Sequence, residues 1–208
     1  MILFSVLIPA IPNRIDRMKA LFNNLQAQVT DANFENEVEI LCFLDNKKRS
    51  VGHKRDGLVQ LARGKYLSFV DDDDVIYCNY ISTIVRAIKA APSDTDVIVY
   101  DQDATINNGG VFKVHFGLEY ANEQAHQKLE KWVDITRKPF HTCTWRTELA
   151  KTERFSDVSY GEDWDWCRRL VAKTSLSKQV RIKETLLKYV FDDKITEAST
   201  ENAIIHTS

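Results

Sequence analysis

The sequence predicts an α/β fold in which a central, mostly parallel β-sheet is flanked by helices. Short apolar runs alternate with helical stripes through the first hundred residues, which is the pattern of βαβ units. The 208 residues are 44% hydrophobic, enough to build a sizeable core without disulfides or metals. With 7 glycines and 4 prolines the chain shows no linker, so we expect one domain over residues 1–208.

Four strands and three helices are expected in the first half. The expected strands, read as buried on both faces, are Leu3–Ile8, Val38–Leu44, Tyr66–Val70 and Val97–Tyr100. The expected helices carry apolar residues at helical spacing in 15–29, 58–62 and 81–88. Asn13 is expected to cap the first helix. Right-handed crossovers would bring the carboxyl ends of these strands to one edge, where open α/β sheets bind ligands.

The second half is less regular. The turn residues Asn107–Gly110 predict that residues 111–116 pair back as a hairpin or edge strand. We expect a helix to begin near Glu162 and a late strand at Leu186–Phe191, whereas residues 118–131 fit no pattern and the tail is expected to be helical.

Charge, cysteines and hydropathy narrow the class of protein. The 28 basic and 30 acidic residues give a net charge of -2, so no general field attracts nucleic acid. The 4 cysteines lack a CxxC pair, which favours a reduced cytoplasmic protein over a disulfide framework or zinc site. The longest apolar stretch, residues 1–11, is far shorter than the ~18 residues of a membrane span and lacks a basic lead. We therefore expect no membrane span and no signal peptide.

The run Asp71–Asp74, directly after an expected strand, is the sharpest chemical feature of the sequence. Four adjacent carboxylates repel one another unless water or a cation compensates them. Their oxygens are ligands that Mg²⁺ and Mn²⁺ prefer, so the run predicts a metal site. The alternative is a solvated acidic turn that caps the following helix.

Two further segments carry candidate chemistry. Gly161–Trp166 places three acids between aromatic residues, where a partly desolvated carboxylate could act as a general base. The alternative is a helix start that acidic residues stabilise. The basic stretch Lys47–Arg55 could contact a diphosphate or be solvated surface. His141 could bind a metal or phosphate, or could be a histidine without a special role. GxSxG, HExxH, P-loop and GxGxxG patterns are absent.

Taken in order, these residues resemble the family 2 glycosyltransferases of the GT-A fold. The matching segments are Val6–Pro9 with Asn13 and Arg14, Leu44–Asp45, Gly52–Gly57, Ala62–Asp74, Gly161–Trp166 and Arg168–Leu170. The resemblance covers residues 3–100 well and 138–190 loosely, and it is closest to compact stand-alone members. Asp56 departs from the family's usual Asn, and a strand common in longer members is missing between Asp45 and Gly52.

The resemblance implies a metal-dependent, inverting glycosyltransferase, a hexosyltransferase, that uses a nucleoside-diphosphate sugar with UDP favoured. The half of the chain at about residues 1–103 would bind the donor, and the half at about residues 104–208 would bind the acceptor. The implied donor-binding residues are Pro9, Asp45, Arg55, Asp71, Asp72 and His141. Asp71 and Asp73 would hold Mn²⁺ or Mg²⁺, with the register of the DxD motif chosen by its spacing from Phe69. Asp163 would be the general base, oriented by Glu162.

Two other classes remain open at this point. A nucleotidyltransferase also uses paired Asp residues and metal, but usually has a Gly-rich, Lys-bearing loop where this chain has Pro9–Pro12. A non-catalytic nucleotide-sugar-binding module would retain the donor site without turnover. The acceptor also stays open between a glycan, a lipid-linked sugar, a protein, a small molecule and a hydroxymethylated DNA base.

Overall fold

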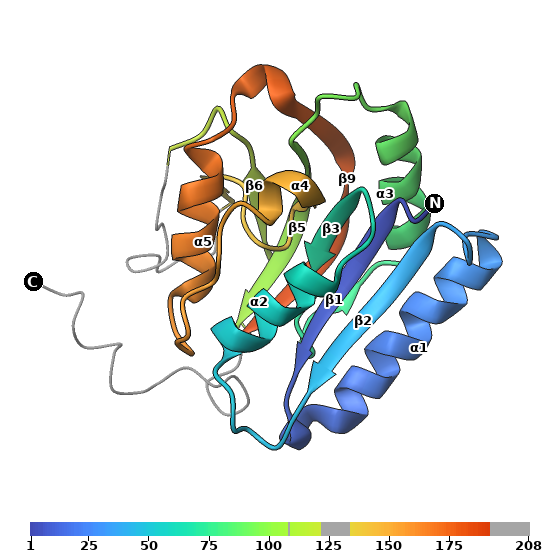
Figure 1. Ribbon diagram of the computed structural model, residues 1–208, viewed down its shortest axis with the longest axis vertical. Coiled ribbons are helices and arrows are strands. Elements are labelled where there is room, and N and C mark those ends of the chain that lie inside the picture. Colours follow the sequence, from blue (N-terminus) through green and yellow to red (C-terminus); the bar gives the residue numbers. More distant parts are fainter. Residues whose placement is uncertain (108, 122–133, 192–208) are drawn as a thin grey trace, which may run out of the picture.

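A computed structural model describes residues 1–107, 109–121 and 134–191 (Figure 1). The strands are β1 (Phe4–Ala10), β2 (Val38–Leu44), β3 (Tyr66–Phe69), β4 (Val75–Ile76), β5 (Val97–Ile106), β6 (Phe112–Phe116), β7 (Ile135–Arg137), β8 (Thr144–Arg146) and β9 (Gln179–Phe191). The α-helices are α1 (Ile15–Asp31), α2 (Val51–Leu61), α3 (Tyr80–Ala90), α4 (Thr147–Ala150) and α5 (Glu162–Val171). Short 3-10 turns occur at η1 (Pro12–Arg14) and η2 (Leu176–Lys178).

All of these strands belong to one sheet, whose main path runs β2-β1-β3-β8-β5-β6-β7. β1 pairs in parallel with both β2 and β3, as the alternation of strands and helices predicts. β8 enters antiparallel between β3 and β5, and β9 pairs in parallel with β5 while also pairing with β4. β6 returns antiparallel to β5, which confirms the predicted hairpin. The predicted α/β fold class is confirmed.

Two apolar layers hold helices against both faces of the sheet (Figure 1). β1 alternates between them, because successive side chains of a strand point to opposite faces. Phe4, Val6 and Ile8 pack with α1 and α3, whereas Leu7 packs in the layer that contains α2 and α5. The sheet is therefore the middle layer of three.

Three details of the prediction were wrong. β2 is an edge strand that pairs only with β1 among the described residues, so it is not buried on both faces throughout: Val38 and Glu39 are buried, whereas Cys42 and Leu44 near its carboxyl end are exposed. Leu61 is 65% exposed at the end of α2 and does not join its buried face. Asn13 does not cap α1, because η1 precedes the helix and begins at Pro12, where the missing N–H costs nothing.

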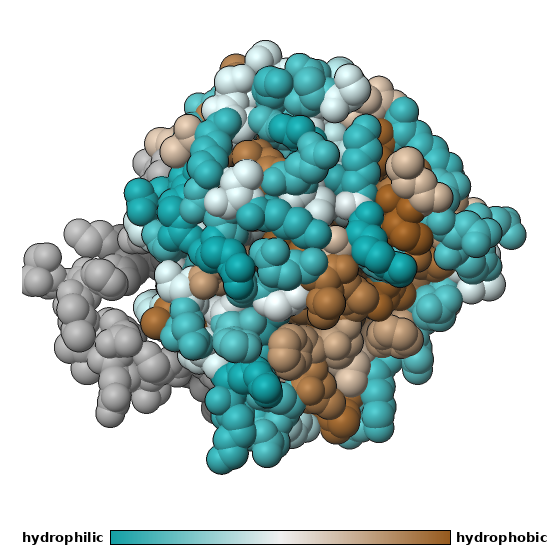
Figure 2. Space-filling view, viewed as in Figure 1, coloured by the Kyte–Doolittle hydropathy of each residue, from teal (hydrophilic) through white to brown (hydrophobic). Residues whose placement is uncertain are grey.

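Apolar surface runs along the edge strand β2 between α1 and α2 in Figure 2. Leu41 and Phe43 of β2 are only partly buried there. Across the described ranges no helix combines the length and apolar character needed to cross a membrane. The four cysteines are free thiols.

Some expectations stay predictions. Most of 118–131 and the tail lie outside the described residues. The division of the chain near residue 103 would fall within β5, which continues to Ile106.

Candidate active site

The carboxyl ends of β1, β2 and β3 meet at one edge of the sheet, and most of the predicted site residues lie there. Pro9 is the second-to-last residue of β1, Asp45 follows β2 directly, and Asp71 lies two residues after the end of β3. Parallel pairing brings these ends together, since Pro9 lies opposite Phe43 and Leu7 lies opposite Phe69. This edge is where α/β sheets bind their ligands.

Asp45 is fixed by the start of α2. Its carboxylate accepts backbone N–H bonds from Lys47 and Arg49, and the Lys54 ammonium lies 2.7 Å away. The hydrogen bond from Lys54 is the main reason that the pKa of Asp45 falls to about 2. Lys54 also donates to the carbonyl of Ala10 and is 2% exposed, so this part of the basic stretch is a buried link between β1 and β2.

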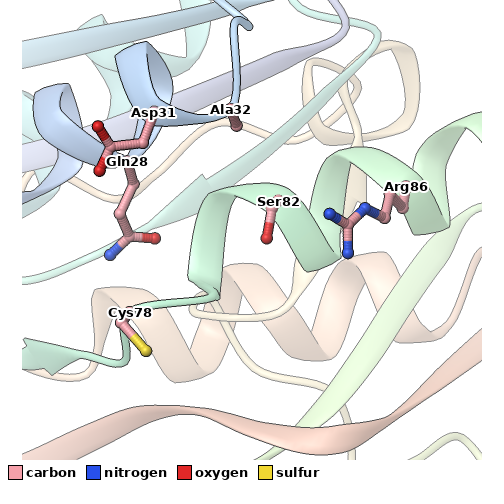
Figure 3. Close-up of a pocket in the computed structure, with 6 residues that line it drawn as sticks. All are labelled: Gln28, Asp31, Ala32, Cys78, Ser82 and Arg86. Atoms are coloured by element: carbon pink, nitrogen blue, oxygen red, sulfur yellow. The ribbon is translucent and has the colours of Figure 1, made fainter.

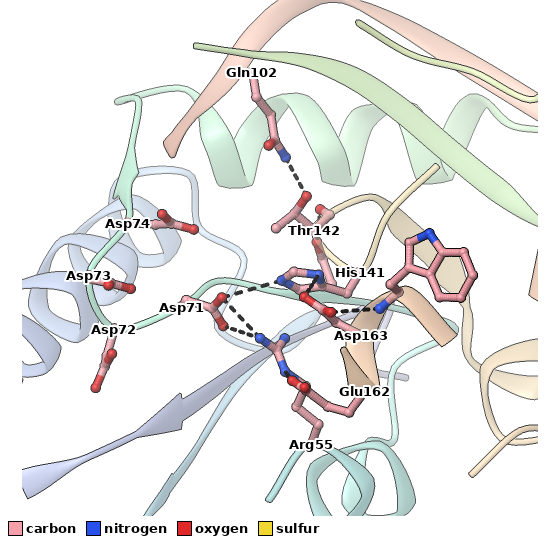
Figure 4. A network of polar contacts seen from close by, with 12 residues as sticks. Arg55, Asp71, Asp72, Asp73, Asp74, Gln102, His141, Thr142, Glu162 and Asp163 are labelled. Atoms are coloured by element: carbon pink, nitrogen blue, oxygen red, sulfur yellow. Dashed lines mark hydrogen bonds and ion pairs between the residues drawn. The ribbon is translucent and has the colours of Figure 1, made fainter. Parts of the chain in front are cut away.

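Arg55 connects three elements of the site (Figure 4). Its Nη2 lies 3.0 and 3.1 Å from the two carboxylate oxygens of Asp71, and its Nε lies 3.2 Å from Oε1 of Glu162. The guanidinium also stacks 5.1 Å from the centre of the Phe69 ring. Burial opposes the charge of Arg55, but the surrounding carboxylates of Asp71, Asp163 and Glu162 raise its pKa above the ordinary value. Arg55 therefore belongs to the site and is not solvated surface.

The four aspartates of the acidic turn point in different directions (Figure 4). Asp72 turns to η1, where it accepts the N–H of Ile11 at 3.0 Å and pairs with Arg14 at 2.8 Å. Asp73 lies 3.1 Å from the same Arg14, and Asp74 accepts the N–H of Val190 at 3.3 Å. Asp72 thus holds the loop after β1, and its predicted donor contact stays a prediction.

Negative charge in this turn exceeds what the two arginines neutralise. Burial and then the charge of Asp71 raise the pKa of Asp73 to about 6, and the same causes raise that of Asp74 well above its ordinary value. One oxygen of Asp74 is buried without a hydrogen-bond partner. At Asp71, in contrast, burial raises the pKa, but the charges and hydrogen bonds of Arg55 and His141 together outweigh it and hold the pKa below the usual range.

The carboxylate oxygens of the acidic turn are of the type that binds divalent cations such as Mg²⁺ and Mn²⁺. The described residues hold no group of three His, Cys, Asp or Glu side chains that could by themselves bind a metal. Mg²⁺ commonly takes only one or two protein carboxylates and completes its shell with phosphate oxygens and water. Asp71 and Asp73 would hold such an ion jointly with a bound diphosphate.

His141 lies between the acidic turn and α5 (Figure 4). Its Nε2 is 3.4 Å from a carboxylate oxygen of Asp71, and its Nδ1 is 3.4 Å from one of Asp163. Burial and the charge of Arg55 lower the pKa of His141. The next residue anchors this loop, because Thr142 accepts hydrogen bonds from Ser68 and Gln102. His141 therefore links the predicted donor side to the predicted base.

α5 begins at Glu162, as predicted, after Gly161 takes a left-handed conformation at φ 75°. Asp163 is 24% exposed and faces His141, whereas Glu162 is 5% exposed and faces Arg55. Burial outweighs the charge of Arg55 at Glu162 and raises its pKa to about 7. The adjacent carboxylates thus have different partners and solvent access.

The aromatic residues around this helix start do not share one role. Trp166 is fully buried and stacks on Phe155 in the core, so it offers no surface to a ligand. Tyr160 and Trp164 are 53% and 42% exposed and remain available. Asp165 points to Arg168 and Arg169, away from His141.

Two residues of the site were not assigned a role from the sequence. Arg14 pairs with Asp72 and Asp73. The sequence indicated only that Arg14 lies in the loop after the first strand. Tyr189 of β9 is 38% exposed, and its pKa is raised by burial and by the charges of Asp74 and Asp71. No local pattern marks Tyr189, because the pairing of β9 with β4 and β5 places it beside the acidic turn.

A separate pocket of about 210 Å³ lies between α1 and α3 (Figure 3). It is lined by Gln28, Asp31, Ala32, Cys78, Ser82 and Arg86, none of which is a predicted site residue. Gln28 is engaged by the protein, because its amide donates to the carbonyl of Tyr77 and accepts the N–H of Ile81.

Neither protein-family models nor curated proteins match the sequence. The structure matches TarS of S. aureus with a TM-score of 0.59 and 15% identity, over 91% of this chain and 37% of that one. The complex of TarS 1–349 with UDP-GlcNAc gives the same TM-score and identity, over 91% of this chain and 58% of that one. The catalytic domain of Drosophila beta1,4-galactosyltransferase 7, solved with xylobiose, gives 0.56 and 13%, over 96% of this chain and 75% of that one.

The chain therefore has the fold of the GT-A glycosyltransferases. The neighbours are TarS and the galactosyltransferase, and at these identities the likeness establishes the fold. The chain spans little more than a third of the longer TarS chain that it matches, so activity and substrates are argued separately from the site.

Proposed function

We propose that the chain is a metal-dependent, inverting glycosyltransferase that moves a hexose from a nucleoside-diphosphate sugar, UDP-linked by preference, to an acceptor hydroxyl. The observation that carries the proposal is the placement of His141 between Asp71 and Asp163, 3.4 Å from each. Two carboxylate groups with different partners therefore face one another across a single imidazole. The TarS complex with UDP-GlcNAc supports the choice of donor.

The donor would lie along the carboxyl edge of β1, β2 and β3. Asp45, held by Lys54, would contact the nucleoside beside Pro9. Arg55 and His141 would position Asp71 toward the ribose and the diphosphate. A divalent ion on Asp71 and Asp73 would offset the charge that develops on the departing diphosphate.

The acceptor would approach from the side of α5. Asp163 would take the proton of the acceptor hydroxyl while that oxygen attacks the anomeric carbon, and the bond to the diphosphate would break on the opposite face. A single displacement of this kind inverts the anomeric configuration. His141 would orient Asp163, and Glu162 would hold Arg55 in place.

A screen of nucleotide sugars tests this proposal before any acceptor is known. Purified protein with Mn²⁺ or Mg²⁺ is expected to release free UDP from at least one UDP-sugar through slow hydrolysis, and faster when the right acceptor is added. The matched control is Asp163→Asn. Binding of nucleotide sugars without any release would instead support a non-catalytic module, and release of pyrophosphate from a nucleoside triphosphate would support a nucleotidyltransferase.

A further inference from the structure

Arg137, at the end of β7, lies close to the proposed base and has no carboxylate partner among the residues that the structure describes. Its guanidinium carbon is 3.9 Å from the centre of the Phe140 ring and 5.8 Å from that of Phe116. The Phe140 ring lies 4.6 Å from the His141 ring, which itself contacts Asp163. Arg137 is therefore one aromatic ring away from the catalytic network.

The absence of a carboxylate partner sets Arg137 apart within the described ranges. The other buried or half-buried arginines there, which are Arg14, Arg55, Arg146 and Arg169, each pair with at least one carboxylate. In that part of the chain Arg137 contacts the rings of Phe140 and Phe116 and no carboxylate. A half-buried cation without a counter-ion is costly, so such a group is uncommon unless it binds something.

The surroundings of Arg137 place it on the acceptor side. The Phe140 ring that Arg137 contacts lies 4.6 Å from the ring of His141, whose Nδ1 is 3.4 Å from Asp163 at the start of α5. Burial lowers the pKa of Arg137, and the nearby Cys167 and Asp163 act in the opposite direction. Stacking on Phe140 occupies the face of the guanidinium, so its N–H edge remains available. That edge presents donors in the fork that matches phosphate and carboxylate groups.

We propose that Arg137 forms an acceptor subsite for an oxyanion, so that the acceptor carries a phosphate or carboxylate group near the hydroxyl that Asp163 deprotonates. The subsite rests on the proposed function and narrows it to anionic acceptors. The donor diphosphate is proposed to bind at a different place, the acidic turn. The arginines there, Arg14 and Arg55, are already paired with carboxylates, unlike Arg137 within the described residues.

An NMR titration tests this subsite with simple probes. Methyl phosphate and, separately, acetate are added to ¹⁵N-labelled protein that is saturated with UDP and Mg²⁺, while the arginine Nε–Hε signals are followed. The Arg137 signal is expected to shift with one of the two probes, which identifies the anion class. Arg137→Gln is expected to weaken that binding about tenfold or more, because a charge-assisted pair is lost.

Two variants keep the test falsifiable. Lys89→Gln is the control, because Lys89 also stacks on a ring, that of Phe34 at 4.8 Å, but is paired with Glu37. Its probe binding is expected to match wild type. If Arg137→Gln fails to fold, Arg137→Lys, which keeps the charge but loses the fork, is expected to give an intermediate loss.

Four results would count against the subsite or against the proposed function on which it rests. Equal probe binding by wild type and by the Arg137 variants overturns it, as does a wild-type Arg137 signal that neither probe moves. A fall in UDP affinity in Arg137→Gln, with no separate probe site, assigns the guanidinium to the donor and also overturns it. Failure of wild type to bind UDP would instead reject the proposed function. Titration of the probes without UDP would then test the anion site at Arg137 independently.

Discussion

At the scale of single residues, Asp163 is the proposed general base, and its acidic neighbours make other contacts. Asp163 faces His141, Glu162 is buried against Arg55, and Asp165 pairs with Arg168 and Arg169. Neighbouring helical residues point in different directions, so the three carboxylates are not interchangeable.

Asp163→Asn is expected to lower the rate of transfer by about 100- to 10,000-fold, the usual effect of removing a general base. UDP affinity and melting temperature are expected to stay near wild type, since Asp163 is partly exposed and an asparagine oxygen can still accept the 2.6 Å hydrogen bond from the backbone N–H of Trp164. Steady-state kinetics and thermal unfolding measure these quantities. Asp165→Asn is the control, and a larger loss of turnover in it than in Asp163→Asn would reject the assignment of the base.

Arg55→Ala is expected to weaken donor binding and also to destabilise the fold. The sequence places Arg55 only as a ligand contact, whereas in the structure it is 3% exposed between Asp71 and Glu162. Removing one member of a buried ion pair commonly costs about 3–5 kcal/mol, because the other charge is left uncompensated. Denaturant unfolding measures the change, and an unchanged midpoint would show that the arginine is not part of the packed network.

At the scale of elements, Glu39 of β2 ties three strands together on the amino side of the sheet. It accepts hydrogen bonds from Ser5 of β1 at 2.7 Å and from both the backbone and side chain of Arg63, which precedes β3. Ser5 also accepts the N–H of Gly64 at 2.9 Å. This junction fixes the start of the strands whose other ends form the site.

The Glu39 junction predicts a pH dependence of stability. Burial raises the pKa of Glu39, but the hydrogen bonds from Arg63 and Ser5 outweigh it and lower the pKa below 4.5. A depressed pKa contributes stability above that ordinary value, and the contribution is lost as the pH falls through the folded-state pKa. Glu39→Gln is expected to be less stable than wild type at pH 7, and in thermal unfolding the difference is expected to shrink as the pH falls through the folded-state pKa of Glu39. A constant difference would contradict this.

The glycines of α2 give a second test at this scale. A Cβ on Gly52 would lie 1.9 Å from the carbonyl oxygen of Ser156, whereas one on Gly57 would meet only the Phe43 ring, at 3.2 Å. Gly52→Ala must therefore displace the loop that leads to α5, and we expect it to lower both melting temperature and turnover. Gly57→Ala is the matched control with a smaller effect. Equal melting temperatures would show that the loop does not pack on α2 in this way.

At the scale of the whole molecule, the fold was largely predictable from the sequence. The ion pairs and contacts within the site were only partly predictable. The apolar runs predicted β2 with its bounds and the start of α5 at Glu162, because burial imposes those patterns locally. Burial of Lys54, the pairing of Arg14 and the placement of Tyr189 depend on contacts between distant segments. A single sequence contains no local signal for them.

The proposed function requires that the carboxyl edge of the sheet bind a nucleoside diphosphate together with a divalent ion on Asp71 and Asp73. The direct measurement is calorimetric titration of UDP at pH 7.5, above the pKa of about 6 for Asp73, so that this carboxylate is ionised as metal binding requires. We expect binding with Mn²⁺, and affinity weaker by about tenfold or more in EDTA or in Asp73→Asn. Equal affinity with Mn²⁺, in EDTA and in Asp73→Asn would contradict the claim.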